Sequence, residues 1–189
     1  MPANSIKRAA VSKRNHHGSN TVEFTYCIVF IFFVLLLPLS NYGTFMSRWG
    51  ISSQTVNAWT QNMAKKRRLS DAFKAFQSAE FLTAVSQPAG IIVKSVTPVL
   101  FISKVDDASH NITVETPGKV PPNWLPDVGN YEYTLKVNVI AQIDPLVTVQ
   151  LFGLKVPGIT EPADVTMGGS ALWENKGRDP GTTEFYLNE

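Results

Sequence analysis

A long run without charge constrains this chain more than any other feature of its sequence. No residue from 24 to 47 is an acid or a base, and Phe, Ile, Val and Leu dominate the run. At 1.5 Å per residue, a helix of this length measures roughly 36 Å, which is enough to cross a hydrocarbon core of about 30 Å with some tilt. We therefore expect a membrane-spanning helix near the N-terminus.

The charges on either side of the run predict its orientation. Arg48 is the only base close to its C-terminal end, whereas four bases with no acid among them lie before Gly18: Lys7, Arg8, Lys13 and Arg14. Because positive charges beside a span stay in the cytoplasm, the N-terminus should be cytoplasmic and the C-terminal part should lie outside. Tyr42 and Trp49 then suit an outer belt of interfacial aromatic side chains.

Glu23 is the last charged residue before the apolar run. A carboxylate at the edge of hydrocarbon costs a few kcal/mol unless something neutralises it, so an ordinary anchor would keep this acid in water. Gly18 lies five residues before Glu23, and Phe24 follows directly. Together with the basic leader, these residues resemble the class III or type IV-like signal of prepilins and pseudopilins.

That resemblance implies a processing event and a role for the acid. A prepilin peptidase would cut after Gly18, so that Ser19 becomes the first residue of the mature protein and is often methylated. The new α-amine of one subunit can then pair with Glu23 of its neighbour in an assembly. Gly18 and Ser19 are thus the expected processing residues, and Glu23 and Phe24 the expected assembly residues.

Chain length distinguishes between groups of these proteins. Small Flp-type pilins of the tight-adherence (Tad) systems are little more than the helix, whereas about 140 residues follow the run here. This size, and the opening of residues 22–39 with its single proline, resemble the TadE-like pseudopilins. Thr25, Tyr26 and Cys27 are more polar than the usual aliphatic start, and Ser19 is not the Phe of major pilins, which argues against a major pilin.

The resemblance implies a minor pseudopilin that takes part in assembling a Tad/Flp-type pilus or a related secretion apparatus. Its partners would be the membrane, a prepilin peptidase, other pilins or pseudopilins and Tad assembly proteins. It would be a single-pass protein of the bacterial inner (cytoplasmic) membrane, with a periplasmic or extracellular C-terminal domain, or a subunit of a pilus. The formal net charge of +2 gives no reason to expect a nucleic-acid partner.

A secretory signal peptide and a lipoprotein signal are competing interpretations of the N-terminus. A secretory signal peptide would need small residues at a cleavage site, but no Ala-x-Ala-like site follows residue 39. A lipoprotein would need small residues before Cys27, where Tyr26 stands. The main alternative is an unprocessed, single-pass membrane anchor that carries an extracytoplasmic β-rich binding domain.

The pattern predicts three regions and an α+β fold. Residues 1–18 form a basic cytoplasmic leader that is cleaved, residues 19–64 a transmembrane and extended helix with a kink at Pro38, and residues 65–189 an extracytoplasmic α+β domain. The basic run at residues 65–68 is expected to be a solvated helix face, with anionic lipid, a pilus partner or nucleic acid as alternatives. Cys27 is the only cysteine, which excludes an intramolecular disulfide.

Periodicity predicts the elements of the domain. Apolar residues at spacings of three and four predict a helix that Ser70 or Asp71 caps, that carries Phe73 and Phe76, and that ends near residues 87–90. Alternation predicts strands over residues 91–96, 99–105, 111–116, 131–143 and 165–173, with Pro98 separating the first two and residues 147–151 continuing the fourth. One wet and one buried face over residues 131–143 is typical of an antiparallel sheet packed against a helix.

Nothing in the sequence predicts an enzyme, a cofactor or a metal site. His16 and His17 precede the expected cut, so His110 is the only histidine of the mature protein, beside Asp106 and Asp107 in an expected turn. An exposed loop histidine explains it. The chain has no glycine-rich phosphate loop, no paired cysteine ligands and no HExxH sequence.

Overall fold

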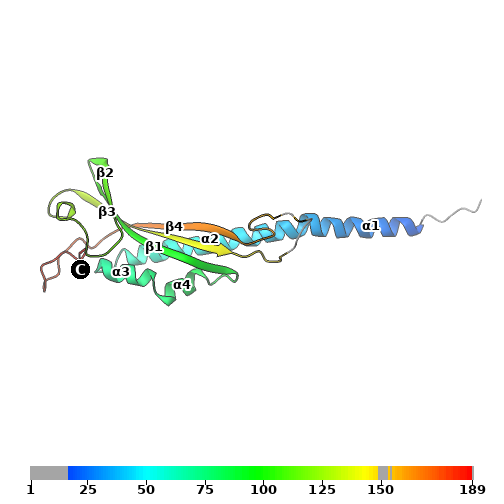
Figure 1. Cartoon of the computed structure of the whole chain (residues 1–189), viewed down its shortest axis with the longest axis horizontal. Helices are drawn as coiled ribbons and strands as arrows, with labels where there is room; N and C mark the ends of the chain where they lie inside the picture. Colours follow the sequence, from blue (N-terminus) through cyan, green and yellow to red (C-terminus); the bar gives the residue numbers. More distant parts are fainter. Residues whose placement is uncertain (1–16, 149–152, 154, 189) are drawn as a thin grey trace, which may run out of the picture. The chain divides into compact units, whose positions relative to one another are not determined.

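The computed structural model describes residues 17–148, 153 and 155–188. The chain divides into two compact units, Met1–Leu37 and Pro38–Glu189. The first contains most of the apolar run, and the second contains the sheet and the remaining helices (Figure 1).

The long apolar N-terminal helix predicted from the sequence is present. It comprises α1 (His17–Ile31), the π-helical turn η1 (Phe32–Leu36) and α2 (Leu37–Met63). In length and composition it could cross a membrane.

The proline of the run coincides with a change in helical hydrogen bonding. The N–H of Leu37 donates to the carbonyl of Phe32, five residues back, directly before Pro38. Pro38 has no N–H, and its ring would clash with a carbonyl of the preceding α-helical turn. A wider π-turn accommodates such a residue within a helix.

Four antiparallel strands form one sheet in the order β2-β1-β3-β4. They are β1 (Ile91–Lys104), β2 (Asp107–Val114), β3 (Tyr131–Ile143) and β4 (Ala163–Leu172). The predicted bounds of β3 are correct, and so is its alternation, because Tyr133 and every second residue after it are buried. The continuation predicted for residues 147–151 is not strand at 147 and 148, and its other residues lie outside those described.

The prediction that Pro98 separates two strands is wrong, because β1 runs through it. Pro98 pairs with Val137 of β3, and β2 pairs with β1 only from Leu100 to Lys104. On the side away from β3, Pro98 therefore lies at a free edge, where a missing N–H removes no ladder hydrogen bond. The register of β1 shifts at two other places, between Val93 and Ser95 against β3 and between Ser103 and Lys104 against β2.

The predicted helix after the basic run is in fact two helices, α3 (Leu69–Phe76) and α4 (Ala79–Val85). Neither Ser70 nor Asp71 caps α3, whose N-cap is Arg68, a residue that makes no side-chain capping hydrogen bond to the helix. Ser78 ends α3 and begins α4, because its hydroxyl donates to the carbonyl of Ala75 at 2.7 Å and accepts from the N–H of Phe81 at 3.3 Å. A short polar side chain that bonds the backbone in this way competes with a continuous helix.

The core lies between one face of the sheet and the helices α2, α3 and α4 (Figure 1). Four residues of the predicted stripe face this core, since Leu69, Ala72, Phe73 and Phe76 are buried, whereas its last member, Ala79, is exposed at the start of α4. The helix α2 contributes Val56 and Met63. The other face of the sheet is wetter and carries polar residues of β3 such as Glu132 and Asn138. A short 3-10 turn, η2 (Pro122–Trp124), lies in the loop before β3.

Candidate functional site

The predicted processing and assembly residues all belong to α1. Gly18 and Ser19 fall in its first turn, and Glu23 and Phe24 follow in the same helix. Residues four apart in an α-helix share a face, so Ser19 and Glu23 lie on one side of α1. Phe24 is 66% exposed within the chain, and Glu23 is exposed as well.

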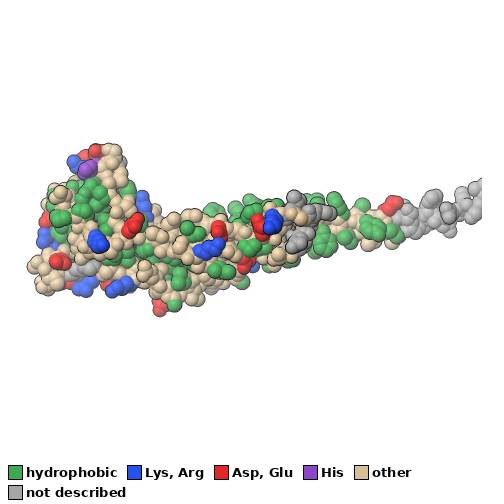
Figure 2. Space-filling model, viewed as in Figure 1, with side chains coloured by type: hydrophobic (Ala, Val, Ile, Leu, Met, Phe, Trp, Pro, Cys, Tyr) green, Lys and Arg blue, Asp and Glu red, His purple; other side chains and the backbone are tan. Residues whose placement is uncertain are grey.

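The apolar segment of this helix has no covering partner within the described part of the chain. Every side chain from residue 21 to residue 36 is exposed, and Figure 2 shows hydrophobic side chains along this part. The hydroxyl of Thr25 donates to the carbonyl of Thr21 at 2.9 Å, so this polar group needs no water. A helix that is apolar on all sides requires a non-aqueous environment, either lipid or other apolar helices.

Asn41 is a functional candidate that the sequence prediction missed. Its side chain is 1% exposed and lies on α2, inside the charge-free run. The amide nitrogen donates to the carbonyls of Val147 at 2.8 Å and Ile159 at 2.7 Å, and the amide oxygen accepts from the N–H of Val147 at 3.0 Å. The signal that could have found it is an amide side chain within an otherwise apolar segment, where such a group needs partners.

The four residues of the basic run are exposed, as predicted, but they form the turn after α2 and not a helix face. Arg67 donates to the hydroxyl of Tyr186 and lies 4.7 Å from the centre of that ring. Arg68 pairs with Asp179 at 2.8 Å, and the N–H of Gly181 together with this pair lowers the pKa of Asp179 below its ordinary value. Both arginines therefore hold the C-terminal segment on the domain.

His110 lies on β2 and not in the turn that was predicted. Its ring stacks on the indole of Trp124, with 4.7 Å between the ring centres and 14° between the planes. Trp124 in turn lies 5.1 Å from the ring of Tyr131. Among the residues that the structure describes, no group of three His, Cys, Asp or Glu side chains could hold a metal ion.

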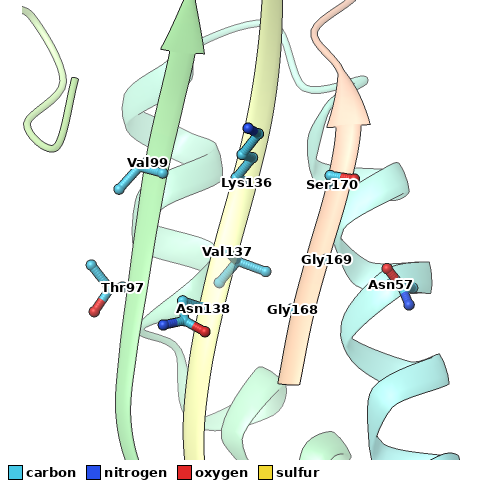
Figure 3. A pocket seen from close by; sticks show the side chains of 9 residues that line it. All are labelled: Asn57, Thr97, Val99, Lys136, Val137, Asn138, Gly168, Gly169 and Ser170. Atoms are coloured by element: carbon cyan, nitrogen blue, oxygen red, sulfur yellow. The ribbon is translucent and has the colours of Figure 1, made fainter. Parts of the chain in front are cut away.

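An open hollow of about 590 Å³ lies on the wetter side of the sheet (Figure 3). Gly168, which has no side chain, is part of its lining, and its polar lining comes from Asn57, Thr97, Lys136, Asn138 and Ser170. The ammonium of Lys136 lies 3.7 Å from the ring centre of Phe101. Amide, hydroxyl and ammonium groups of this kind can hold a polar ligand by hydrogen bonds.

Comparison with known proteins identifies no relative. No protein-family model matches the chain, and neither a curated protein nor a solved structure matches it.

Proposed function

We propose that this chain is a minor pseudopilin-like structural component that takes part in assembling a Tad/Flp-type pilus or a related secretion apparatus. A prepilin peptidase cuts it after Gly18, the helix anchors it in the inner membrane, and the α+β domain lies on the periplasmic or extracellular side. Other pilins or pseudopilins and Tad assembly proteins are its partners.

The observation that carries this proposal is that the two ends of one helical segment differ in burial. Its first part exposes every side chain from residue 21 to residue 36, whereas its last turns bury Val56, Thr60 and Met63 in the core of the domain. A cleavable secretion signal does not need to contribute to the core of the domain that follows. A helix used both for insertion and for the domain core suits a protein that is held in a membrane and then packed beside other apolar helices.

Glu23 adds an electrostatic argument. It is the only charged residue between residues 15 and 47, and it lies where the apolar surface begins. An opposite charge about 4 Å away is worth roughly 4 kcal/mol at an effective dielectric constant of 20, against about 1 in water. A mature α-amine at Ser19 of a neighbouring subunit would supply that charge and would favour assembly over the isolated state.

The alternative is an unprocessed membrane anchor with an extracytoplasmic binding domain. The open hollow beside Lys136 and Asn138 favours it, because such a surface can take a polar ligand without any assembly. The two proposals differ in the state of the N-terminus, since the anchor keeps residues 1–18 and the pseudopilin loses them.

The test is the intact mass of the full-length protein co-expressed with or without a prepilin peptidase. With the peptidase, we expect a protein that begins at Ser19, with or without an N-terminal methyl group. Gly18→Leu should stay full length and inserted, because the peptidase requires a small residue before the bond, whereas the control Gly43→Ala should be cut normally. A full-length wild type in the presence of active peptidase would favour the anchor, and a protein that begins beyond residue 39 would indicate a signal peptidase.

A further inference from the structure

The loop between β3 and β4 is fixed to α2 at two places. Asn41 bonds the backbone of Val147 and of Ile159. Gly158 lies against the ring of Phe45, where a Cβ would come within 3.1 Å, and its φ of +78° also favours glycine. We name the described part of this segment, residues 144–148 and 155–162, the β3–β4 loop.

The position of this loop along α2 follows from a third contact. Arg48 donates to the carbonyl of Asp144 at 2.6 Å, one residue beyond the end of β3. Asn41 lies seven residues before Arg48, which is about 10 Å further towards the N-terminus of α2. The β3–β4 loop thus extends beyond the sheet and lies against the turns of α2 that belong to the charge-free run (Figure 1).

The outer surface of this loop exposes three large apolar side chains, beside the exposed Thr148 and Lys155. Leu146, Val147 and Val156 are 54%, 44% and 39% exposed. The backbone around Val156 closes its own turn, because its carbonyl accepts from the N–H of Thr160 at 2.9 Å and its N–H donates to that residue's hydroxyl at 2.8 Å. Backbone whose N–H and C=O groups are hydrogen-bonded within the protein can approach hydrocarbon. An ordinary loop cannot, because its backbone groups bond to water.

Neighbouring turns of α2 also expose large apolar side chains. Leu39, Tyr42 and Met46 are 63%, 49% and 39% exposed within the chain. Counted from Glu23, a hydrocarbon core of about 30 Å takes about 20 residues of helix and ends close to Gly43. In a membrane span that begins at Glu23, Asn41 and the loop residues bound to it would therefore lie at the outer edge of the core.

We propose that the β3–β4 loop is a second membrane-contacting element, and that a phospholipid bilayer covers Leu146, Val147 and Val156. Asn41 fixes the loop against the helix and keeps its own amide away from lipid. Lys155, which is exposed beside Val156, reaches the phosphate level. This inference rests on the membrane anchoring in the proposed function, but it does not depend on cleavage after Gly18 or on pilus assembly.

The experiment measures the depth of single labelled cysteines in the full-length chain. The protein is placed in vesicles of phosphatidylcholine and phosphatidylglycerol whose acyl chains carry bromine either near the headgroup or near the chain end. A fluorophore is attached to Cys27 of the otherwise unchanged chain, or to Val147→Cys or Leu172→Cys in a Cys27→Ala background. Leu172 is the matched control, because it is 59% exposed and ends β4 at the opposite end of the sheet.

We expect the label at position 147 to lose emission chiefly to bromine near the headgroup. The label at Cys27, about 6 Å inside the inner edge counted from Glu23, should lose emission to bromine at both positions, and the label at position 172 should lose none. Quenching at Cys27 without quenching at 147 would overturn the loop proposal and leave the anchor intact. No quenching at either site would refute both. Equal quenching at 147 and 172 would contradict a specific contact of the loop. A label at position 147 that bromine quenches only after the protein is diluted in lipid would indicate that a second copy of the chain, and not lipid, covers this surface at higher protein density.

Discussion

At the scale of single residues, two adjacent glycines in β4 have different neighbours. Gly169 faces α2, and a Cβ there would lie 2.3 Å from Oγ1 of Thr60 and 3.1 Å from the carbonyl oxygen of Val56. Gly168 faces the wetter side of the sheet, and its nearest neighbour would be 3.9 Å away. Gly169 therefore sets how closely α2 can approach the sheet, whereas Gly168 forms the floor of the hollow.

Gly169→Ala should destabilise the domain by about 2 kcal/mol, because the close backbone contact leaves no room for a methyl group. Gly168→Ala should change stability by less than about 0.5 kcal/mol or increase it slightly, since alanine suits a strand better than glycine does. Thermal unfolding of the full-length protein in detergent compares the two variants. Adding Thr60→Ala to Gly169→Ala should recover part of the loss, because it removes the nearer of the two clashes. Equal melting temperatures of the two glycine variants would show that α2 does not pack this closely on β4.

At the scale of elements, local side-chain hydrogen bonds decide where helices and loops end. Ser78 separates α3 from α4 by bonding the backbone on both sides, although the apolar spacing alone favours one longer helix. In the same way, Asn41 fixes the β3–β4 loop, which has neither strand nor helix over its described residues apart from an isolated bridge between Pro157 and Glu161. At each place, one polar side chain bonds backbone groups that regular secondary structure leaves without a partner.

Ser78→Ala should cost about 1 kcal/mol of domain stability, which is the usual effect of removing an N-cap hydroxyl. Thr83→Ala is the matched control, because Thr83 lies on the exposed face of the same helix and alanine is the better helix former. Denaturant unfolding followed by circular dichroism measures both. A loss at Thr83 as large as that at Ser78 would mean that the cap is not the cause.

Asn41→Ala should release the β3–β4 loop while the sheet stays folded, because three hydrogen bonds to Val147 and Ile159 are lost together. Hydrogen exchange should show the N–H of Val147 exchanging at least about tenfold faster. The N–H of Trp173, which donates to the carbonyl of Tyr133 at 2.8 Å, serves as a reference within the sheet and should not change. Thr44→Ala, which removes a hydroxyl bonded within the helix, should leave both amides as they are. Unchanged exchange at Val147 in Asn41→Ala would contradict the role assigned to this amide.

At the scale of the whole molecule, the chain divides into two compact units with different surfaces. The unit Met1–Leu37 contains Glu23 and most of the apolar surface, and the unit Pro38–Glu189 contains the core of the α+β domain. A change in the first unit should therefore alter insertion or assembly without unfolding the second. This separation makes the assembly role proposed for Glu23 testable apart from folding.

Glu23→Ala should leave the protein inserted and its domain folded, but it should abolish crosslinking or co-purification with other pilus components. Glu23→Asp should be intermediate, because the charge remains while its reach shortens by one methylene group. Glu80→Ala, at an exposed glutamate of α4, controls for the loss of a carboxylate elsewhere. Membrane fractionation, thermal unfolding and crosslinking of the three variants supply the readouts. If Glu23→Ala assembles as well as the wild type, the plain membrane anchor becomes the better account of this chain.

Part of this molecule follows from residues that are close together in the chain. A charge-free run predicts the long apolar helix, and strict alternation predicts β3 with its buried face, because both patterns are repeated locally and depend only on which side of an element faces water. The roles proposed for Gly18, Ser19, Glu23 and Phe24 also come from the sequence, and the structure adds that these residues share one helix. Pro98 and the break at Ser78 were mispredicted, since local rules do not say which edge of a strand is free or which carbonyl a hydroxyl will reach.

The sequence by itself determined the apolar helix, the charge asymmetry around it and an antiparallel sheet packed on helices. Only the tertiary structure decided that α2 enters the core beside Gly169, that Arg67 and Arg68 hold the C-terminal segment, and that Asn41 binds the β3–β4 loop 106 and 118 residues away. These contacts join positions that no sequence period relates. They form because the strands bring distant backbone groups to α2. There, a buried amide such as that of Asn41 can bond those groups, and a glycine such as Gly169 leaves room for the helix.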